Sequence, residues 1–186
     1  DESKVEEFSM DVFKGRLYPS QERFKYPKAG QKNSKVQINI FNTKTKENIV
    51  ANVNKKTEHY LPRIKWTNQT NQLFVQRLNR HQNHLELLSV NPTNGNAKLI
   101  FEEKDKYYID IHDNLTFYKD DSGFLWTSEK DGYNHIYLFQ MNGKERRQIT
   151  KGKWEVTQFY GYDDVNKILY YQSNEESPLE KDIYRI

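Results

Sequence analysis

Alternation of apolar and polar residues with a period of two dominates the amino-acid sequence. Residues 36–40 (Val-Gln-Ile-Asn-Ile) alternate without a break. Short apolar runs follow them at 73–75, 85–88, 98–101, 124–126, 136–139 and 168–171. These runs are rich in β-branched and aromatic side chains, which suit a pleated, half-buried surface. Because no stretch of ten or more residues has a clear 3.6-residue period, the pattern predicts an all-β fold.

Clusters of turn-forming residues separate the apolar runs. They lie at 91–95, 119–123, 142–143 and 163–166 and are rich in Asn, Asp and Gly. Asn and Gly tolerate a positive φ angle, and an Asp side chain accepts hydrogen bonds from its own turn, so each cluster can reverse a strand. We therefore expect neighbouring strands to pair as antiparallel hairpins.

The strands repeat along the chain. Segments 74–77, 124–127 and 169–172 occupy equivalent places, separated by 50 and then 45 residues. Each follows a strand that ends near an aromatic residue and precedes a second apolar strand, and a fourth strand closes the first two units. Four short strands in each tandem repeat of this length are typical of β-propeller blades. A β-sandwich is the alternative, but its strands carry no such self-similarity.

The repeat predicts part of one propeller domain, with about three and a half four-stranded antiparallel blades. We expect an extended strand arm at 1–30 and a partial blade at 31–56. Complete blades are expected at 57–104 and 105–152, and an incomplete blade at 153–186. The sequence starts at Asp1 without a Met and ends at Ile186 inside a predicted strand, which favours a piece of a longer protein.

Composition removes several classes of protein. The 29 Lys and Arg residues nearly balance the 26 Asp and Glu residues, and this mixed charge does not indicate nucleic-acid binding. No apolar run approaches the length of a membrane helix. The absence of Cys excludes disulfides, thiolate zinc sites and a cysteine nucleophile. A hydrophobic share of 35% that includes 14% aromatics fits blades that share their faces with neighbours.

Four strings in the sequence resemble the propeller of the dipeptidyl peptidase IV family. They are Y-P-K-A-G at 26–30, D-G-Y-N-H-I-Y at 131–137, I-T-K-G-K-W-E-V at 149–156 and Y-Y-Q-S-N-E at 170–175. The strings follow the order of the family's own segments at comparable spacing. The resemblance therefore extends over nearly the whole chain.

The resemblance implies an eight-bladed propeller that precedes an α/β-hydrolase domain with a Ser-Asp-His triad. Such enzymes remove dipeptides from peptide N-termini and prefer Pro or Ala in the second position. None of the eight Gly residues belongs to a G-x-S-x-G nucleophile motif, so we expect no catalytic residue in this chain. Peptide substrate and the protein's own hydrolase domain are the implied partners, and no cofactor is implied. A non-catalytic binding propeller or inactive homologue remains an alternative, as does a small carbohydrate-binding sandwich.

Residues from about 8 to 30 resemble the extended arm of the family's fourth blade, which builds a homodimer together with the hydrolase domain. The expected dimer contacts are Phe8, Leu17, Tyr18, Phe24, Tyr26 and Pro27. An exposed aromatic ribbon is costly in a monomer and favourable at a two-fold interface. The alternative is a hairpin packed on its own blade.

Glu6 and Glu7 resemble the family's double glutamate, which binds the α-ammonium group of the substrate. Glu7 precedes Tyr26 by 19 residues, whereas the family's pair lies several tens of residues before that tyrosine. We therefore expect Glu6 and Glu7 to lie on the strand that enters the arm. The substrate-binding pair is expected upstream of this chain.

Residues 107–112 correspond to the family's loop that reaches the extended subsites of the substrate. The family's aromatic residue followed by Arg is absent from this stretch, which leaves Tyr108 and His112 as candidate substrate contacts. Packing in the core of a blade strand is the alternative role for both.

The remaining histidines do not predict a metal site. The spacing of His81 and His84 should place them on opposite faces, and no carboxylate is expected to complete a ligand set. His135 is expected to make structural hydrogen bonds within a blade. The basic run at 144–147 is expected to be a solvated hairpin. Because animal members carry propeller disulfides, the lack of Cys favours a bacterial protein that is periplasmic or otherwise exported.

Overall fold

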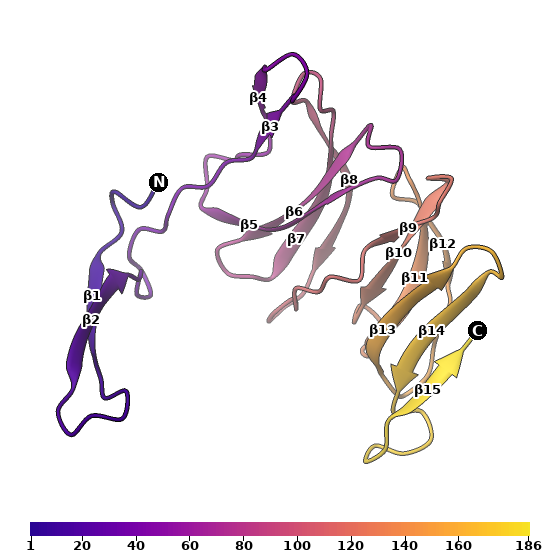
Figure 1. The fold of residues 1–186 in the computed structure, drawn as a ribbon. Coiled ribbons are helices and arrows are strands. Elements are labelled where there is room, and N and C mark those ends of the chain that lie inside the picture. Colours follow the sequence, from indigo (N-terminus) through magenta and orange to yellow (C-terminus); the bar gives the residue numbers. More distant parts are fainter.

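The computed structural model describes residues 1–186 and consists of β-strands joined by turns and loops. Its fifteen strands form five antiparallel sheets, which follow one another in sequence order along an arc (Figure 1). The prediction of an all-β fold is confirmed. No helix in the structure is long and apolar enough to cross a membrane.

Two short hairpins begin the chain. The first pairs β1 (Glu7–Val12) with β2 (Ser20–Lys25), and the second pairs β3 (Asn39–Phe41) with β4 (Asn48–Val50). The β1–β2 hairpin stands apart from the other sheets as a long ribbon (Figure 1). It is therefore not packed on a blade.

Three larger sheets follow, and in each the strands pair in chain order. The first contains β5 (His59–Trp66), β6 (Leu73–Asn79), β7 (His84–Val90) and β8 (Ala97–Lys104). The second contains β9 (Thr116–Phe117), β10 (Gly123–Ser128), β11 (His135–Gln140) and β12 (Glu145–Gln148). The third contains β13 (Val156–Asp163), β14 (Ile168–Ser173) and β15 (Asp182–Arg185). These tandem antiparallel meanders are propeller blades.

The core lies between blades rather than within one sheet. Strand β6 shows this because alternate side chains point to opposite faces. Phe74 and Leu78 pack with aromatic residues of the next sheet, including Phe124 and Trp126. Residues on the other face pack toward the preceding hairpin and form a cluster of Ala51, Val53, Leu73, Val75, Leu88 and Val90. The central strands are therefore buried on both faces.

Two glycines mark a repeated close approach between blades. Gly95 lies in the β7–β8 turn and Gly143 in the β11–β12 turn, with φ angles of +73° and +87°. A Cβ atom at either position would overlap a carbonyl oxygen of the preceding blade, that of Val50 or that of Ile100. The equivalent turns thus bring the backbones of adjacent blades into direct contact.

The strand predicted at 36–40 is shorter in the structure, where β3 begins at Asn39. The N–H of Lys35 donates to the carbonyl of Asp1 at 3.0 Å, and the amino group of Asp1 donates to the carbonyl of Lys35 at 2.8 Å. The chain at Lys35 thus pairs with the start of the sequence, whereas the carbonyl of Ile38 accepts the N–H of Ala51, just after β4, at 2.9 Å. Ile38 and Ile40 both pack against the cluster around Val53, so the alternation marks one buried face even though regular strand pairing begins only at Asn39.

Candidate functional site

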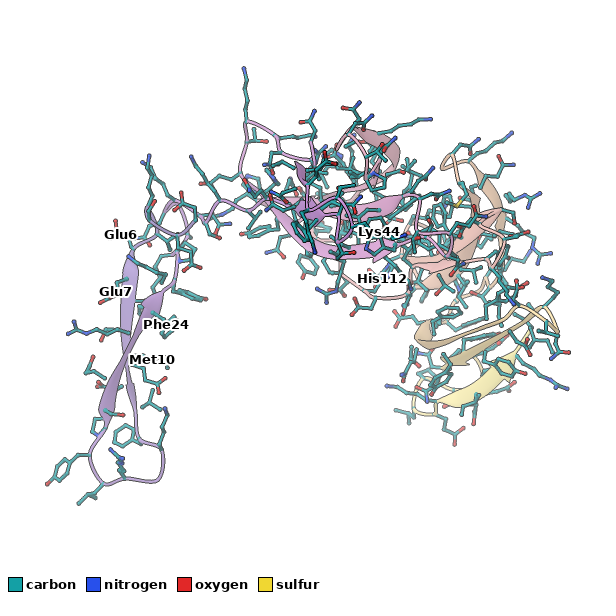
Figure 2. All side chains as sticks on the ribbon, turned by 45° about the horizontal axis from the view of Figure 1, so that its top comes forward. Glu6, Glu7, Met10, Phe24, Lys44 and His112 are labelled. Carbon is teal, nitrogen blue, oxygen red and sulfur yellow. The ribbon has the colours of Figure 1, made fainter.

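The β1–β2 ribbon, called the arm below, has two unlike faces. Its register places Phe8 opposite Phe24 and Met10 opposite Glu22. On the other face lie the pairs Glu7–Lys25, Ser9–Arg23 and Asp11–Gln21. The first face thus carries the apolar side chains of the ribbon and has no second layer beneath it (Figure 2).

Three aromatic rings gather at the base of the arm. The ring centroids of Phe8, Phe24 and Tyr26 lie 5.8 to 6.0 Å from one another. The ammonium group of Lys28 lies 3.9 Å from the centroid of the Phe8 ring, within the range of a cation–π interaction. The Tyr26 N–H also donates to the carbonyl of Glu6 at 3.1 Å. These contacts fix the base of the arm.

The tip of the arm exposes large apolar side chains. Leu17 is 84% exposed and Tyr18 is 78% exposed. The reversal that presents them uses positive φ angles at Lys14 and Gly15 and is closed by a 2.8 Å bond from the Arg16 N–H to the Phe13 carbonyl. The predicted contact residues therefore occupy both ends of the arm, with Pro27 half-buried beside the base.

Glu6 and Glu7 lie at the entrance to the arm, as expected. Glu7 begins β1, and its carboxylate lies 3.9 Å from the guanidinium of Arg23 across the ribbon. The carbonyl of Glu6 belongs to the same backbone ladder. The structure does not bring either residue together with the candidate substrate contacts Tyr108 and His112 (Figure 2).

Tyr108 and His112 line one cleft of about 450 Å³ between the sheets β5–β8 and β9–β12. The segment that carries them is a connection between blades and not a blade strand. The Asp105 carboxylate accepts the N–H groups of Tyr107 and Tyr108, at 2.6 and 3.2 Å, and this turn interrupts the strand. Tyr108 is 52% exposed, and its hydroxyl makes no hydrogen bond within the chain. That hydroxyl is free to bind a ligand.

His112 has a different role in the cleft. Its Nε2 lies 2.7 Å from the carbonyl of Thr127, while the Asn114 N–H donates to its Nδ1 at 3.2 Å. Because a carbonyl only accepts, Nε2 carries the proton and Nδ1 accepts. Burial lowers the pKa of His112 to about 4, so the ring is neutral at neutral pH. The ring also packs on Trp126 at 4.2 Å. His112 therefore positions the wall of the cleft and has no ring nitrogen left for substrate.

The cleft is acidic. Its carboxylates are Glu102, Glu103, Asp105, Asp110 and Glu129, against two lysines, Lys104 and Lys130. Burial raises the pKa of Glu103, whose carboxylate accepts a 3.0 Å hydrogen bond from the indole of Trp126. Burial and the charge of Asp110 raise the pKa of Glu129.

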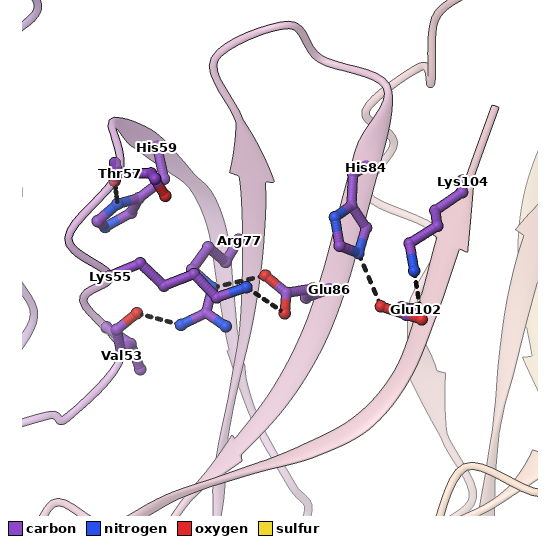
Figure 3. Close-up of polar contacts among 9 residues, drawn as sticks. All are labelled: Val53, Lys55, Thr57, His59, Arg77, His84, Glu86, Glu102 and Lys104. Carbon is purple, nitrogen blue, oxygen red and sulfur yellow. Dashed lines mark hydrogen bonds and ion pairs between the residues drawn. The ribbon is translucent and has the colours of Figure 1, made fainter. Parts of the chain in front are cut away.

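A polar network on β7 and β8 corrects one expectation about the histidines. His84 lies 2.7 Å from the carboxylate of Glu102 (Figure 3), and possible ligand atoms of His84, Glu86 and Glu102 all lie within 4.8 Å of one another, so the prediction that no carboxylate completes a ligand set is wrong. Glu86 and Glu102 face each other across the two strands, a pairing that sequence spacing does not reveal. Each carboxylate already has cationic partners, Arg77 and Lys55 for Glu86 and Lys104 for Glu102. The network is thus balanced by the chain's own charges.

His135 makes the structural hydrogen bonds that were expected of it. It is fully buried, and its ring nitrogens lie 3.1 Å from the Thr150 hydroxyl and 3.2 Å from the Gly152 carbonyl. The Thr150 hydroxyl also accepts the N–H of Ile136 at 3.0 Å. His135 therefore ties β11 to the connection that follows β12.

Tandem antiparallel blades with a projecting arm define this chain as part of a β-propeller. The chain belongs to the dipeptidyl peptidase IV family, because the family model for the dipeptidyl peptidase IV (DPP IV) N-terminal region matches residues 1–186. This assignment confirms the resemblance seen in the sequence.

Solved and curated relatives agree with the assignment. The crystal structure of Porphyromonas gingivalis dipeptidyl peptidase 4 superposes with a TM-score of 0.89 at 39% identity, over 100% of this chain and 26% of that one. Inactive dipeptidyl peptidase 10 of Mus musculus is 31% identical over 99% of this chain and 25% of its own length. The chain thus spans about a quarter of these relatives.

Proposed function

We propose that this chain is the non-catalytic propeller portion of a serine dipeptidyl peptidase that releases X-Pro and X-Ala dipeptides from peptide N-termini. The observation that supports this most strongly is the similarity along its whole length to Porphyromonas gingivalis dipeptidyl peptidase 4. The reaction would use a Ser nucleophile activated by His, in a hydrolase domain outside these residues.

The blades would contribute steric selection. Their interfaces are closed by aromatic clusters, such as the stacked rings of Phe101, Phe124 and Phe139. Closely packed interiors resist deformation, so a wall built from such blades would admit peptide ends and reject folded proteins. Within this wall, the Tyr108 hydroxyl would be a direct contact for the extended part of a peptide.

A second candidate function is that of a non-catalytic interaction scaffold. It is favoured by the 31% identity to the mouse inactive dipeptidyl peptidase 10. The same blades serve either function, and the two candidates differ in the hydrolase domain.

We predict that the full-length protein hydrolyses Gly-Pro-p-nitroanilide, because the proposed Ser attacks the carbonyl of the proline and releases nitroaniline. Release of nitroaniline is followed by absorbance, with a variant lacking the nucleophilic Ser as the control. Residues 1–186 alone should release none. A full-length protein that binds Gly-Pro peptides without hydrolysing this substrate would favour the scaffold, and hydrolysis by the isolated chain would contradict the non-catalytic assignment.

We also propose that the arm forms a homodimer contact. Its unpartnered apolar face and exposed tip support this, because a two-fold interface buries such surface. The periplasmic or otherwise exported location expected from the sequence stays a prediction.

The double substitution Leu17→Asp/Tyr18→Asp is expected to weaken dimerisation by about tenfold or more, because two charges would enter an apolar contact. Sedimentation of the full-length protein over a concentration series measures this. Val165→Asp is the matched control, since Val165 is 85% exposed in the β13–β14 turn and Leu17 is 84% exposed in the arm. An unchanged dimer in the double variant would show that the tip is outside the interface.

A further inference from the structure

A second cavity lies where the arm joins the blades and is unlike the acidic cleft. Its volume is about 460 Å³, and it is lined by residues from three stretches, 1–4, 32–36 and 54–59. Val36 is the one apolar residue among its fourteen lining residues. The volume falls within the range of small-molecule sites, about 300–1,000 Å³, but the lining is polar.

The lining of this basal pocket is strongly cationic. It contains five lysines and one histidine, namely Lys4, Lys32, Lys35, Lys55, Lys56 and His59. Lys55 pairs with the buried Glu86 at 2.8 Å (Figure 3). The other four lysines form no ion pair with any carboxylate of the chain. Four of the lysines that line this cavity thus have no ion-pair partner within the chain.

The two acidic residues of the lining have other partners than these four lysines. The Glu58 carboxylate accepts hydrogen bonds from the Arg80 guanidinium and from the Asn33 N–H, both at 3.1 Å. The Asp1 carboxylate accepts the Ser3 N–H at 3.0 Å. Neither carboxylate forms an ion pair with a lysine of the pocket, and the lining carries five lysines against two carboxylates, so its net charge is positive.

The floor of the basal pocket is held in place by its own hydrogen bonds. The His59 ring lies between two oxygen atoms, 2.9 Å from the Thr57 carbonyl and 3.2 Å from the Asn54 side chain. Asp1 and Lys35 exchange two backbone bonds at the opposite wall. The lysines thus project from anchored backbone, which lowers the entropy lost when they bind a common partner.

We propose that the basal pocket binds a compact, multiply charged oxyanion, such as a phosphate or sulfate group. Such a group accepts hydrogen bonds from several ammonium groups at once, and charge-assisted bonds of this kind are the stronger ones. The concave shape fits a small ligand, whereas an extended polyanion needs an open basic surface. This site is distinct from the Tyr108 cleft, and its occupancy does not depend on peptidase activity.

Isothermal titration calorimetry of the full-length protein with inorganic phosphate, and separately with sulfate, tests the proposal in chloride buffer at constant ionic strength. We expect one bound anion per chain. The double substitution Lys35→Gln/Lys56→Gln should weaken binding by about tenfold, because two charged donors are lost. Lys44→Gln is the matched control, since Lys44 is an exposed lysine without an ion pair in the β3–β4 turn (Figure 2).

None of the three lysine side chains forms an ion pair, so we expect both variants to fold, and thermal unfolding checks this. Failure of the wild-type protein to bind either anion would overturn the proposal. Weakening by Lys44→Gln of about threefold, half of the double variant's effect on a logarithmic scale, would also overturn it, since binding would then follow net charge. A full-length wild-type protein that binds the anion but does not hydrolyse Gly-Pro-p-nitroanilide would contradict the proposed peptidase function and support the anion site.

Discussion

Arg77→Met is expected to lower the free energy of unfolding of the propeller by about 3 kcal/mol, because it leaves a buried carboxylate without its main partner. Arg77 is 8% exposed and Glu86 is 7% exposed. Their ion pair measures 2.8 Å, and the Arg77 guanidinium also donates to the carbonyl of Val53 in the connection between β4 and β5. The substitution thus removes an ion pair within a blade and a link to that connection.

The ion pair should also give stability a characteristic dependence on pH. Burial raises the pKa of Glu86, but the hydrogen bonds and charges of Arg77 and Lys55 outweigh burial and lower it to about 2, from 4.5 for a free side chain. The unfolded chain therefore binds a proton more readily between pH 4.5 and 2. Stability from this group is complete above pH 4.5 and is lost as the pH falls toward 2. Arg77→Met should flatten this part of the profile.

Hydrogen exchange of amides in β6 and β7 measures the effect in the full-length protein, where about 3 kcal/mol corresponds to roughly 100-fold faster exchange of the core. Lys55→Met is the comparison within the same network. The Lys55 side chain is 43% exposed, so its loss should cost under about 1 kcal/mol. The double variant Arg77→Met/Glu86→Leu should recover much of the lost stability. Unchanged exchange in Arg77→Met would mean that water or Lys55 compensates Glu86 fully.

The blades could be predicted from sequence because each central strand is a short run of apolar residues that can be recognised without knowing its neighbours. In β6 and β10, successive apolar residues pack alternately against the preceding and the following blade. The turns between strands are marked in the sequence by Asn, Asp and Gly. The recurrence of such strands then indicates a propeller. The strand predicted at 36–40 starts later in the structure, at Asn39, because alternation does not show where regular pairing with a partner strand begins.

The chemistry of the surfaces could be predicted less well, because it arises from residues that meet only across strands or blades. The cluster of His84 and Glu102 depends on the β7–β8 register. The ring of His112 donates to the carbonyl of Thr127, which belongs to the next blade, and accepts the N–H of Asn114. The basal pocket likewise joins three stretches that are far apart in sequence. Spacing along one segment carries no information about such contacts.

Gly143→Ala is expected to destabilise the propeller by about 3 kcal/mol, since it combines backbone strain of about 1–2 kcal/mol with overpacking of about 1–3 kcal/mol. The φ angle of Gly143 is +87°, which L-residues with a Cβ rarely adopt. The new methyl group would also overlap the carbonyl oxygen and carbon of Ile100 in the preceding blade. Because that neighbour is strand backbone, relief requires a shift between two blades. Thermal unfolding and exchange of β8 and β12 amides measure the cost.

Gly30→Ala separates the two contributions. Gly30 has nearly the same φ angle, +81°, but a Cβ there would meet no atom within 4 Å. Its cost should be about 1 kcal/mol, from backbone strain alone. The difference between the two variants then reports the close approach of the blades. Equal losses of unfolding free energy in the two variants would show that adjacent blades move apart easily at this turn. The equivalent contact of Gly95 with Val50 would then not be a rigid link between blades either.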